Sequence, residues 1–340
     1  MDLIEWCERG WVPDSLTRLG IRKLSAQRLR DERLGNPQQS KYRQVAQLRE
    51  SPIAIETAAA NEQHYEVPAS FFEHCLGKRL KYSSCYYPRG DESLDQAEEA
   101  MLALYLERGE FVDGMDVLEL GCGWGSLTLY LAEQLPTSRI TAVSNSNSQR
   151  EHIQNRCAAM GISNVTVITK DVNQLDLNDE QFDRCISIEM FEHMRNYQTL
   201  LGNIASWLKP GGKLFVHIFA HRDLLYPFET EGADNWMGRH FFTGGLMPSA
   251  DTLLYFQQEL LLEQQWWLDG THYQRTSEHW LANTDRHSDA IAELFAQTYG
   301  IDQAQRWLQR WRMFYLACAE CFGYDQGRQW GVAHYRFIKR

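Results

Sequence analysis

This chain of 340 residues lacks a long hydrophobic run, and no apolar stretch approaches the roughly 20 residues that a membrane-spanning helix needs. It also lacks internal repeats and low-complexity linkers. Its first ten residues carry Asp2, Glu5 and Glu8 in place of the basic and then apolar segment of a signal peptide. We therefore expect no membrane span, no signal peptide and a cytoplasmic location.

The chain contains few cysteines and fewer basic than acidic residues. Eight scattered cysteines indicate reduced thiols rather than a disulfide framework. The formal net charge is -11, and phosphate binding needs a concentrated basic surface, so nucleic acid is not an expected partner. Cys318 and Cys321 have metal-ligand spacing, but they lie in an apolar helical stretch without a second pair. We interpret them as buried thiols and expect no metal.

Aromatic residues, by contrast, are plentiful: they make up 12% of the chain and include 11 tryptophans. Such a content suggests an aromatic ligand pocket in addition to a packed core. Trp307, Trp311 and Phe314 fall at helical spacing. We therefore expect most of these rings to belong to the core and only one or two tryptophans to contact a ligand.

The first 60 residues are predicted to be mostly helical, with breaks at Gly10, Pro13, Gly20 and residues 35–37. An amphipathic helix is predicted over residues 93–108, where Ser93 and Gln96 have capping-box spacing.

Short apolar runs then alternate with helical or turn-rich stretches, a pattern that predicts strand-helix-strand units in a largely parallel sheet. The runs are Val117–Leu120, Ile140–Ser144, Val165–Thr169, Cys185–Ile188 and Leu214–Ile218. Two later runs, Leu260–Leu268 and Val332–Ile338, are predicted to add strands at one edge, with a helix-rich insertion between them. The sequence thus predicts an α/β fold.

A glycine-rich turn, Gly121-x-Gly123-x-Gly125, follows the first predicted strand and leads into a helix. Glycines let the backbone approach a ligand, and the helix start offers free N–H groups. A dinucleotide site would space its glycines as Gly-x-Gly-x-x-Gly and place an acid after the second strand. Residues 144–149 carry neutral hydroxyls and amides there instead, and Ser126 lacks the Gly-x-Ser-x-Gly elbow of a hydrolase.

With Glu119 in front of it, this turn resembles the Glu-x-Gly-x-Gly-x-Gly motif of Rossmann-like (class I) methyltransferases that use S-adenosyl-L-methionine. Asp171 and Val172 follow the third strand, where the resemblance implies contact with an adenine amino group. The cofactor-binding residues implied are Tyr82, Ser83, Glu119, Gly121, Gly123, Gly125, Asn145, Gln149, Asp171 and Val172.

Segments outside the glycine turn resemble the cyclopropane fatty acid synthase superfamily, namely residues 64–68, 82–86, 188–194 and 215–217. Other runs resemble its coclaurine N-methyltransferase-like branch, namely residues 9–14, 18–22, 241–245, 247–250, 254–257 and 322–324. The resemblance extends from about residue 3 to 338. It implies an N-terminal helical cap and entrance segment over residues 1–91, a cofactor-binding core over 92–222, and a substrate-binding lid with the last strands over 223–340.

The chain departs from the cyclopropane synthases at the residues that hold their bicarbonate base. Those enzymes place a cysteine directly after a Tyr-Ser pair, whereas this chain has Ser84 there and Cys85 one place later. Their C-terminal tyrosine falls on Phe314, beside Tyr315. Glu192 and His217 are kept, so half of a bicarbonate site is in question, while the N-methyltransferase branch does not need one.

The chemistry of methyl transfer to an amine requires a lone pair that carries no proton and a site that excludes water. Glu189, Glu192 and His193 follow the fourth strand, where ligands bind in such sheets. We interpret both glutamates as attracting an ammonium group, and His193, held by a neighbouring carboxylate, as the general base. By resemblance these are the catalytic positions of the N-methyltransferases. The alternative is that Glu189 caps a helix and His193 lies in the core.

The prediction is an N-methyltransferase that acts on a small aromatic or heterocyclic amine, similar to a tetrahydroisoquinoline. The alternatives are a cyclopropane synthase-like enzyme acting on unsaturated fatty acyl chains, and a non-catalytic protein that binds S-adenosylmethionine. The sequence leaves a homodimer open. Phe242 is expected to help close the amine pocket. The predicted substrate-binding residues are Tyr65, Glu66, Tyr86, His217, Phe241 and Phe314.

Overall fold

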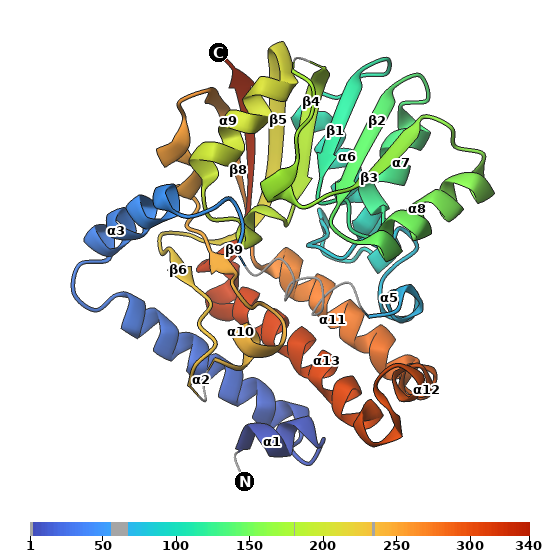
Figure 1. Cartoon of the computed structure of the whole chain (residues 1–340). Coiled ribbons are helices and arrows are strands. Elements are labelled where there is room, and N and C mark those ends of the chain that lie inside the picture. Colours follow the sequence, from blue (N-terminus) through green and yellow to red (C-terminus); the bar gives the residue numbers. More distant parts are fainter. Residues whose placement is uncertain (1–2, 56–66, 180, 233–234) are drawn as a thin grey trace.

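Figure 1 shows the computed structural model of the chain, in which residues 3–55, 67–179, 181–232 and 235–340 are described. A seven-stranded sheet forms its centre, with the strand order β3-β2-β1-β4-β5-β9-β8. The first five of these strands run parallel, and β9 and β8 are antiparallel to their neighbours. The predicted α/β class and the mostly parallel sheet are therefore confirmed.

Each predicted apolar run forms a strand. The strands are β1 (Asp116–Leu120), β2 (Arg139–Ser144), β3 (Val165–Thr169), β4 (Phe182–Ile188), β5 (Leu208–His221), β8 (Leu260–Asp269) and β9 (Trp330–Lys339). A separate two-stranded sheet pairs β6 (Tyr226–Pro227) with β7 (Leu246–Met247). The predicted edge strands β8 and β9 are joined by α11 (Thr271–Arg286), α12 (Ser288–Tyr299) and α13 (Ile301–Phe322).

Helices and 3-10 turns follow the parallel strands in alternation. They are α6 (Leu94–Gly109) before β1, then α7 (Ser126–Gln134), α8 (Asn147–Met160), η1 (Val172–Gln174), η2 (Phe191–His193) and α9 (Tyr197–Trp207). At the start of α6, the Ser93 hydroxyl accepts a hydrogen bond from the Gln96 N–H and the Gln96 side chain accepts one from the Ser93 N–H, which confirms the predicted capping box. The other short elements are α5 (Ala69–Cys75), α10 (Trp236–His240), η3 (Thr252–Phe256) and η4 (Tyr324–Gly327).

The N-terminal region is helical, as predicted, with α1 (Leu3–Glu8), α2 (Asp14–Glu32) and α3 (Pro37–Glu50). The predicted break at Gly20 is wrong, because α2 runs through it without interruption. A single glycine costs an exposed helix only about 1 kcal/mol, which neighbouring turns can offset. In Figure 1, α1 and α2 lie along α13, and α10, α11 and α13 lie beyond the carboxyl ends of the parallel strands.

Two hydrophobic cores cover the opposite faces of the sheet. Phe215 of β5 packs with residues of α6, α7 and α11 to α13, while its neighbours Leu214 and Val216 pack with α9 and η3. The alternation follows from the period of two residues in a strand. Among the described residues, none of the helices combines the length and the apolar character required to cross a bilayer.

Candidate active site

Two adjoining cavities open at the carboxyl ends of the parallel strands. The larger has a volume of about 210 Å³ and the smaller about 70 Å³. Gly121, Gly123, Gln149, Met190 and His193 line both cavities, so the two meet at the turns after β1 and β4. Ligands of open α/β sheets bind at this edge, and the pair of cavities can hold two ligands in contact.

The glycine turn shapes the junction between the cavities. Gly121 has φ +81°, and a Cβ atom built on it would lie 2.9 Å from the Met190 Cβ. Gly123 has φ +51°, and a Cβ there would meet no atom within 4 Å, because this residue faces open cavity. Gly125 was expected to bind the cofactor, but it lines neither cavity. Its missing side chain instead lets the start of α7 pack against Ile153.

Buried polar atoms near this turn have no partner among the described residues. The Gln149 Oε1 atom accepts a 2.7 Å hydrogen bond from the Ser144 hydroxyl, but its Nε2 atom is unpartnered, as is the Ser126 hydroxyl. Burial raises the pKa of Glu119, which lines the larger cavity, to about 8, although Thr128 donates to it at 2.6 Å. Unpartnered buried groups beside an open glycine backbone fit a polar ligand such as S-adenosylmethionine.

The smaller cavity combines polar ends with apolar walls. Asn145, Asp171 and Val172 line it, as predicted for a cofactor site, together with Leu120, Val143 and Leu175. Apolar walls with a few polar groups at the end suit a flat ring that carries an amino group, such as adenine.

A strap made of residues 49–55 forms one more wall of the smaller cavity through Ala54 and Ile55. Asn173 holds this strap: it accepts from the Ala54 N–H at 3.0 Å and donates to the Ala54 carbonyl at 3.2 Å. Asn196 donates to the Arg49 and Ser51 carbonyls, both at 2.9 Å. The strap is therefore fastened to the turns after β3 and β4.

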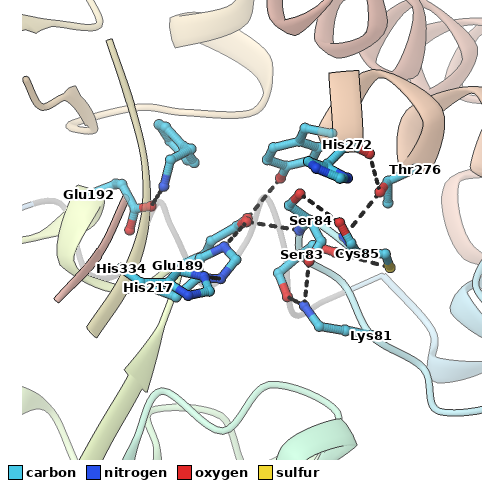
Figure 2. Close-up of polar contacts among 12 residues, drawn as sticks. Lys81, Ser83, Ser84, Cys85, Glu189, Glu192, His217, His272, Thr276 and His334 are labelled. Atoms are coloured by element: carbon cyan, nitrogen blue, oxygen red, sulfur yellow. Dashed lines mark hydrogen bonds and ion pairs between the residues drawn. The ribbon is translucent and has the colours of Figure 1, made fainter. Parts of the chain in front are cut away.

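Glu189 occupies a strained backbone position at the end of β4, with φ +47°. Its Oε1 atom accepts from the Ser84 N–H at 2.9 Å and contacts the His217 Nε2 atom at 3.0 Å, while Oε2 accepts from the Tyr273 hydroxyl at 2.7 Å (Figure 2). Left-handed backbone at a residue other than glycine costs about 1–3 kcal/mol and is concentrated at functional sites. The carboxylate of Glu189 lines the larger cavity.

Glu192 lies near Glu189 but outside the cavity lining. One of its oxygens accepts from the Phe219 N–H at 2.7 Å, and the other has no partner among the described residues. Burial and the charge of Glu189 raise the pKa of Glu192 well above its usual range. Burial also raises the pKa of Glu189, against the opposing charge of Lys81 and donors from Ser84 and Tyr273. We place the negative charge of the pair on Glu189, because its partners provide more donors.

His193 lies where the two cavities meet, and its ring stacks on Phe242 at a centroid distance of 4.5 Å. The carboxylate of Glu189 contacts another histidine, His217, at 3.0 Å. His217 is fully buried and lines neither cavity, although we predicted that it binds substrate. Its place is behind Glu189, on the side away from the cavity.

Aromatic side chains contribute ten of the 30 described residues that line the larger cavity; they are Tyr82, Tyr105, Trp124, Phe219, Tyr226, Phe228, Phe242, Tyr273, Phe314 and Phe322. Phe314 thus lies where it was expected. Phe241 does not, because it is fully buried and stacks on Phe314 at 4.6 Å, so that its neighbour Phe242 takes the position on the cavity wall. Tyr86 packs against His272 outside the cavity, and Tyr65 and Glu66 lie outside the described residues.

Three residues of the site escaped prediction. Lys81 is 2% exposed, lines the larger cavity and donates to the Ser83 hydroxyl at 2.5 Å and the Ser84 carbonyl at 2.7 Å. Tyr273 and His334 come from α11 and β9, far from Glu189 in sequence. Lys81 directly precedes the predicted Tyr82 and Ser83, a signal that could have found it; the other two have no local motif.

Comparisons with known proteins agree with this geometry. The family model for mycolic acid cyclopropane synthetase matches residues 54–329. The chain is 37% identical to (S)-coclaurine N-methyltransferase of Thalictrum flavum subsp. glaucum, over 100% of this chain and 96% of that one. It is 29% identical to cyclopropane-fatty-acyl-phospholipid synthase of Escherichia coli (strain K12), over 82% of this chain and 68% of that one.

A solved structure extends the likeness to three dimensions. The crystal structure of coclaurine N-methyltransferase bound to N-methylheliamine and SAH superposes with a TM-score of 0.95 and 36% identity, covering 99% of each chain. The similarity includes both halves of the site, the cofactor turns and the C-terminal insertion.

Proposed function

Since this chain belongs to the mycolic acid cyclopropane synthetase family and is an N-methyltransferase that uses S-adenosyl-L-methionine, we propose that its acceptor is the nitrogen of a small aromatic or heterocyclic amine, similar to a tetrahydroisoquinoline. The observation that carries the proposal is the carboxylate of Glu189 in an aromatic-walled cavity beside the glycine turn. A negative charge and aromatic faces both attract a cation, while the apolar wall accepts a ring.

The cofactor, when bound, supplies the methyl group on its sulfonium. We assign its binding to Tyr82, Ser83, Glu119, the Gly121 and Gly123 backbone, Asn145, Gln149, Asp171 and Val172, with Gly125 supporting the turn. These residues surround the junction of the two cavities, so the methyl group would face the larger one. Close approach of the two reacting atoms and exclusion of water are what such a junction contributes to the rate.

The acceptor must lose a proton before it can react, because an aliphatic amine has a pKa near that of lysine, about 10.4. In this proposal Glu189 attracts the ammonium group, and His193 takes the proton as general base. The nitrogen lone pair then forms the new C–N bond as the C–S bond breaks. Glu192, which carries its own proton beside Glu189, acts on the site through that neighbour.

A cyclopropane synthase-like reaction is not favoured by these residues. Its bicarbonate would need the imidazole of His217, whose Nε2 atom already lies 3.0 Å from Glu189 Oε1, and Ser84 stands where those enzymes place a cysteine. Phe314 offers no hydroxyl to replace the missing tyrosine. A non-catalytic cofactor-binding protein would have no use for a buried anion in its second cavity.

We propose the domain organisation that the sequence predicts: residues 1–91 form the cap and entrance, residues 92–222 form the cofactor-binding core, and residues 223–340 form the acceptor-binding lid. The free thiols of all eight cysteines favour a reducing compartment, the cytoplasm. The net charge of -11 argues against a nucleic-acid partner. A homodimer is the assembly to test by light scattering.

The decisive experiment incubates the protein with S-adenosylmethionine labelled on its methyl group and two separate panels, cyclic aromatic amines and unsaturated phospholipids. We expect label in the amine fraction alone, on nitrogen, with mass spectrometry locating the added methyl group. Label in the lipid fraction alone would refute the amine proposal. Tight binding of the cofactor without transfer to either panel would favour the non-catalytic alternative.

A further inference from the structure

A continuous line of polar contacts leads from the cavity along the face of the sheet that α6 covers, and it ends at Arg108 of α6. Glu189 Oε1 lies 3.0 Å from His217 Nε2, His217 Nδ1 lies 2.9 Å from His334 Nε2, and His334 Nδ1 lies 2.8 Å from Arg108 Nη1. His217 and His334 face each other in the register of β5 and β9, and both are fully buried (Figure 2). Arg108 does not line the cavity.

The chemistry of Arg108 fixes the direction of every hydrogen bond in this line. A guanidinium can only donate, so the Nδ1 atom of His334 must accept. Neutral His334 then carries its proton on Nε2 and donates it to the Nδ1 atom of His217. His217 must in turn carry its proton on Nε2, where it donates to the carboxylate of Glu189. The hydroxyl of Tyr105, 2.8 Å from the same Nδ1 atom of His217, can donate there as well.

Electrostatics exclude the charged forms of the two histidines. Burial lowers the pKa values of His217 and His334 well below the usual range, and the nearby charges of Lys81 and Arg108 lower them further. Both rings are therefore neutral at physiological pH. A neutral imidazole has a single N–H proton, so the proton position that Arg108 imposes on His334 also determines the proton position on His217.

We propose that Arg108 and His334 are positioning residues for the methyl transfer, which set the tautomer of His217 and so keep Glu189 ionised and oriented toward the acceptor. This inference rests on the proposed function. The line is not a route for removing the proton of the amine, because Arg108 cannot accept one at its far end. Its effect is static: Glu189 gains a third donor, beside the Ser84 N–H and the Tyr273 hydroxyl.

Loss of this line of contacts should change how the activity depends on pH. Without Arg108, His334 is free to turn its proton to Nδ1, and His217 then presents a lone pair to Glu189. The carboxylate would have to be protonated to bond to that lone pair, so its pKa would rise further. Activity that needs ionised Glu189 would then be lost at a higher pH as the solution is acidified. The titratable groups around Glu189 are Lys81, Cys85, Tyr105, Glu192, His217, Tyr273 and Cys318. Tyr82 and the proposed general base His193 line the same cavity.

A matched pair of substitutions at His334 tests the proposal. His334→Gln keeps an oxygen that can accept from Arg108 and an N–H that can donate to His217, whereas His334→Leu keeps neither. We expect His334→Leu to move the acidic limb of the kcat/KM profile up by about one pH unit, the effect of one charge-assisted hydrogen bond. His334→Gln should stay near the unchanged enzyme. Equal profiles for the two variants would overturn the proposal.

Substitutions at Arg108 test whether this residue sets the direction of the hydrogen bonds. Arg108→Met removes the donor but keeps a side chain that can cover Trp266, and it should move the limb in the same direction, with Arg108→Lys recovering most of the shift. Arg336→Met is the control: Arg336 lies over the same ring, and its described bonds go to Glu110, Glu263 and the Arg108 carbonyl, none of them to His334. A shift of equal size in the control would contradict the proposal.

A spectroscopic readout separates this inference from the proposed function. In protein labelled with 15N-histidine, the signals assigned to His217 and His334 by their loss in variants should both show the proton on Nε2. Arg108→Met should change that pattern. If the amine panel gave no product, the proposed function would fail while this measurement still decided the tautomers. A proton on Nδ1 of either ring in the unchanged protein would overturn the proposed role of Arg108 and His334.

Discussion

The two cavities that meet at His193 are built in different ways. The cofactor side is made largely of turns that directly follow β1, β2 and β3, and it includes the glycine turn with the open position at Gly123. The acceptor side is made of side chains from at least five separate elements, with buried charges on Lys81 and Glu189. One side therefore depends on local conformation and the other on long-range packing. Substitutions should affect binding on the first side and turnover or selectivity on the second.

The largest expected effect is on the acceptor side, at Glu189. Glu189→Gln keeps the shape of the side chain but removes the charge, so turnover at neutral pH should fall by about a hundredfold or more. Binding of S-adenosylhomocysteine, measured by calorimetry, should change little. The control is Glu293→Gln, which removes an exposed glutamate on α12. Full turnover in Glu189→Gln would contradict the assigned role.

The next effect is on the cofactor side, at Gly121. Gly121→Ala would bring a methyl group to 2.9 Å from Met190 at a backbone angle that side chains rarely adopt. Cofactor affinity should fall by about tenfold or more, because the turn must move to relieve about 1–3 kcal/mol of strain. Gly202→Ala is the matched control: Gly202 lies in α9 with open space around it, and alanine there should be neutral or stabilising. Equal affinity in both variants would argue against a tight cofactor turn.

Adjacent phenylalanines distinguish the cavity wall from the core behind it. Phe242→Leu should raise KM for the amine severalfold with little change in thermal stability, because Phe242 lines the cavity. Phe241→Leu should lower the free energy of unfolding by about 1–3 kcal/mol, because Phe241 is fully buried against Phe314. Thermal unfolding and amine titrations on both variants measure the contrast. The reverse result would mean that the lid changes its packing when substrate binds.

The smallest effect concerns the strap over the smaller cavity. Asn173→Ala removes two hydrogen bonds to Ala54, each worth about 1 kcal/mol. Release of S-adenosylhomocysteine, followed by stopped-flow fluorescence, should become severalfold faster while amine affinity stays the same. Asn203→Ala on α9, where the described contact uses only the backbone carbonyl, is a suitable control. An unchanged release rate would mean that the strap does not hold the ligand.

Prediction from the sequence was most successful where one segment carries its own signal. The strand β1, the glycine turn and α7 follow one another directly, so the fold could be predicted from spacing and resemblance, and most of the predicted cofactor residues line the two cavities. The predicted residues that line neither cavity lie where tertiary contacts place them. Gly125 packs against a helix, and Phe241 rather than Phe242 faces the core, a choice that depends on how α10 and α13 pack.

The sequence by itself determined an α/β sheet, a cofactor turn and an acidic and histidine-containing segment after β4, because hydrophobic period, glycine spacing and motif order are local properties. Only the tertiary structure decided which of the two glutamates faces the cavity, and which histidine touches it. The reason is that burial, donors from a distant loop, helix and strand, and the charge of Lys81 together determine the ionisation of Glu189. None of these partners lies within the segment that contains Glu189.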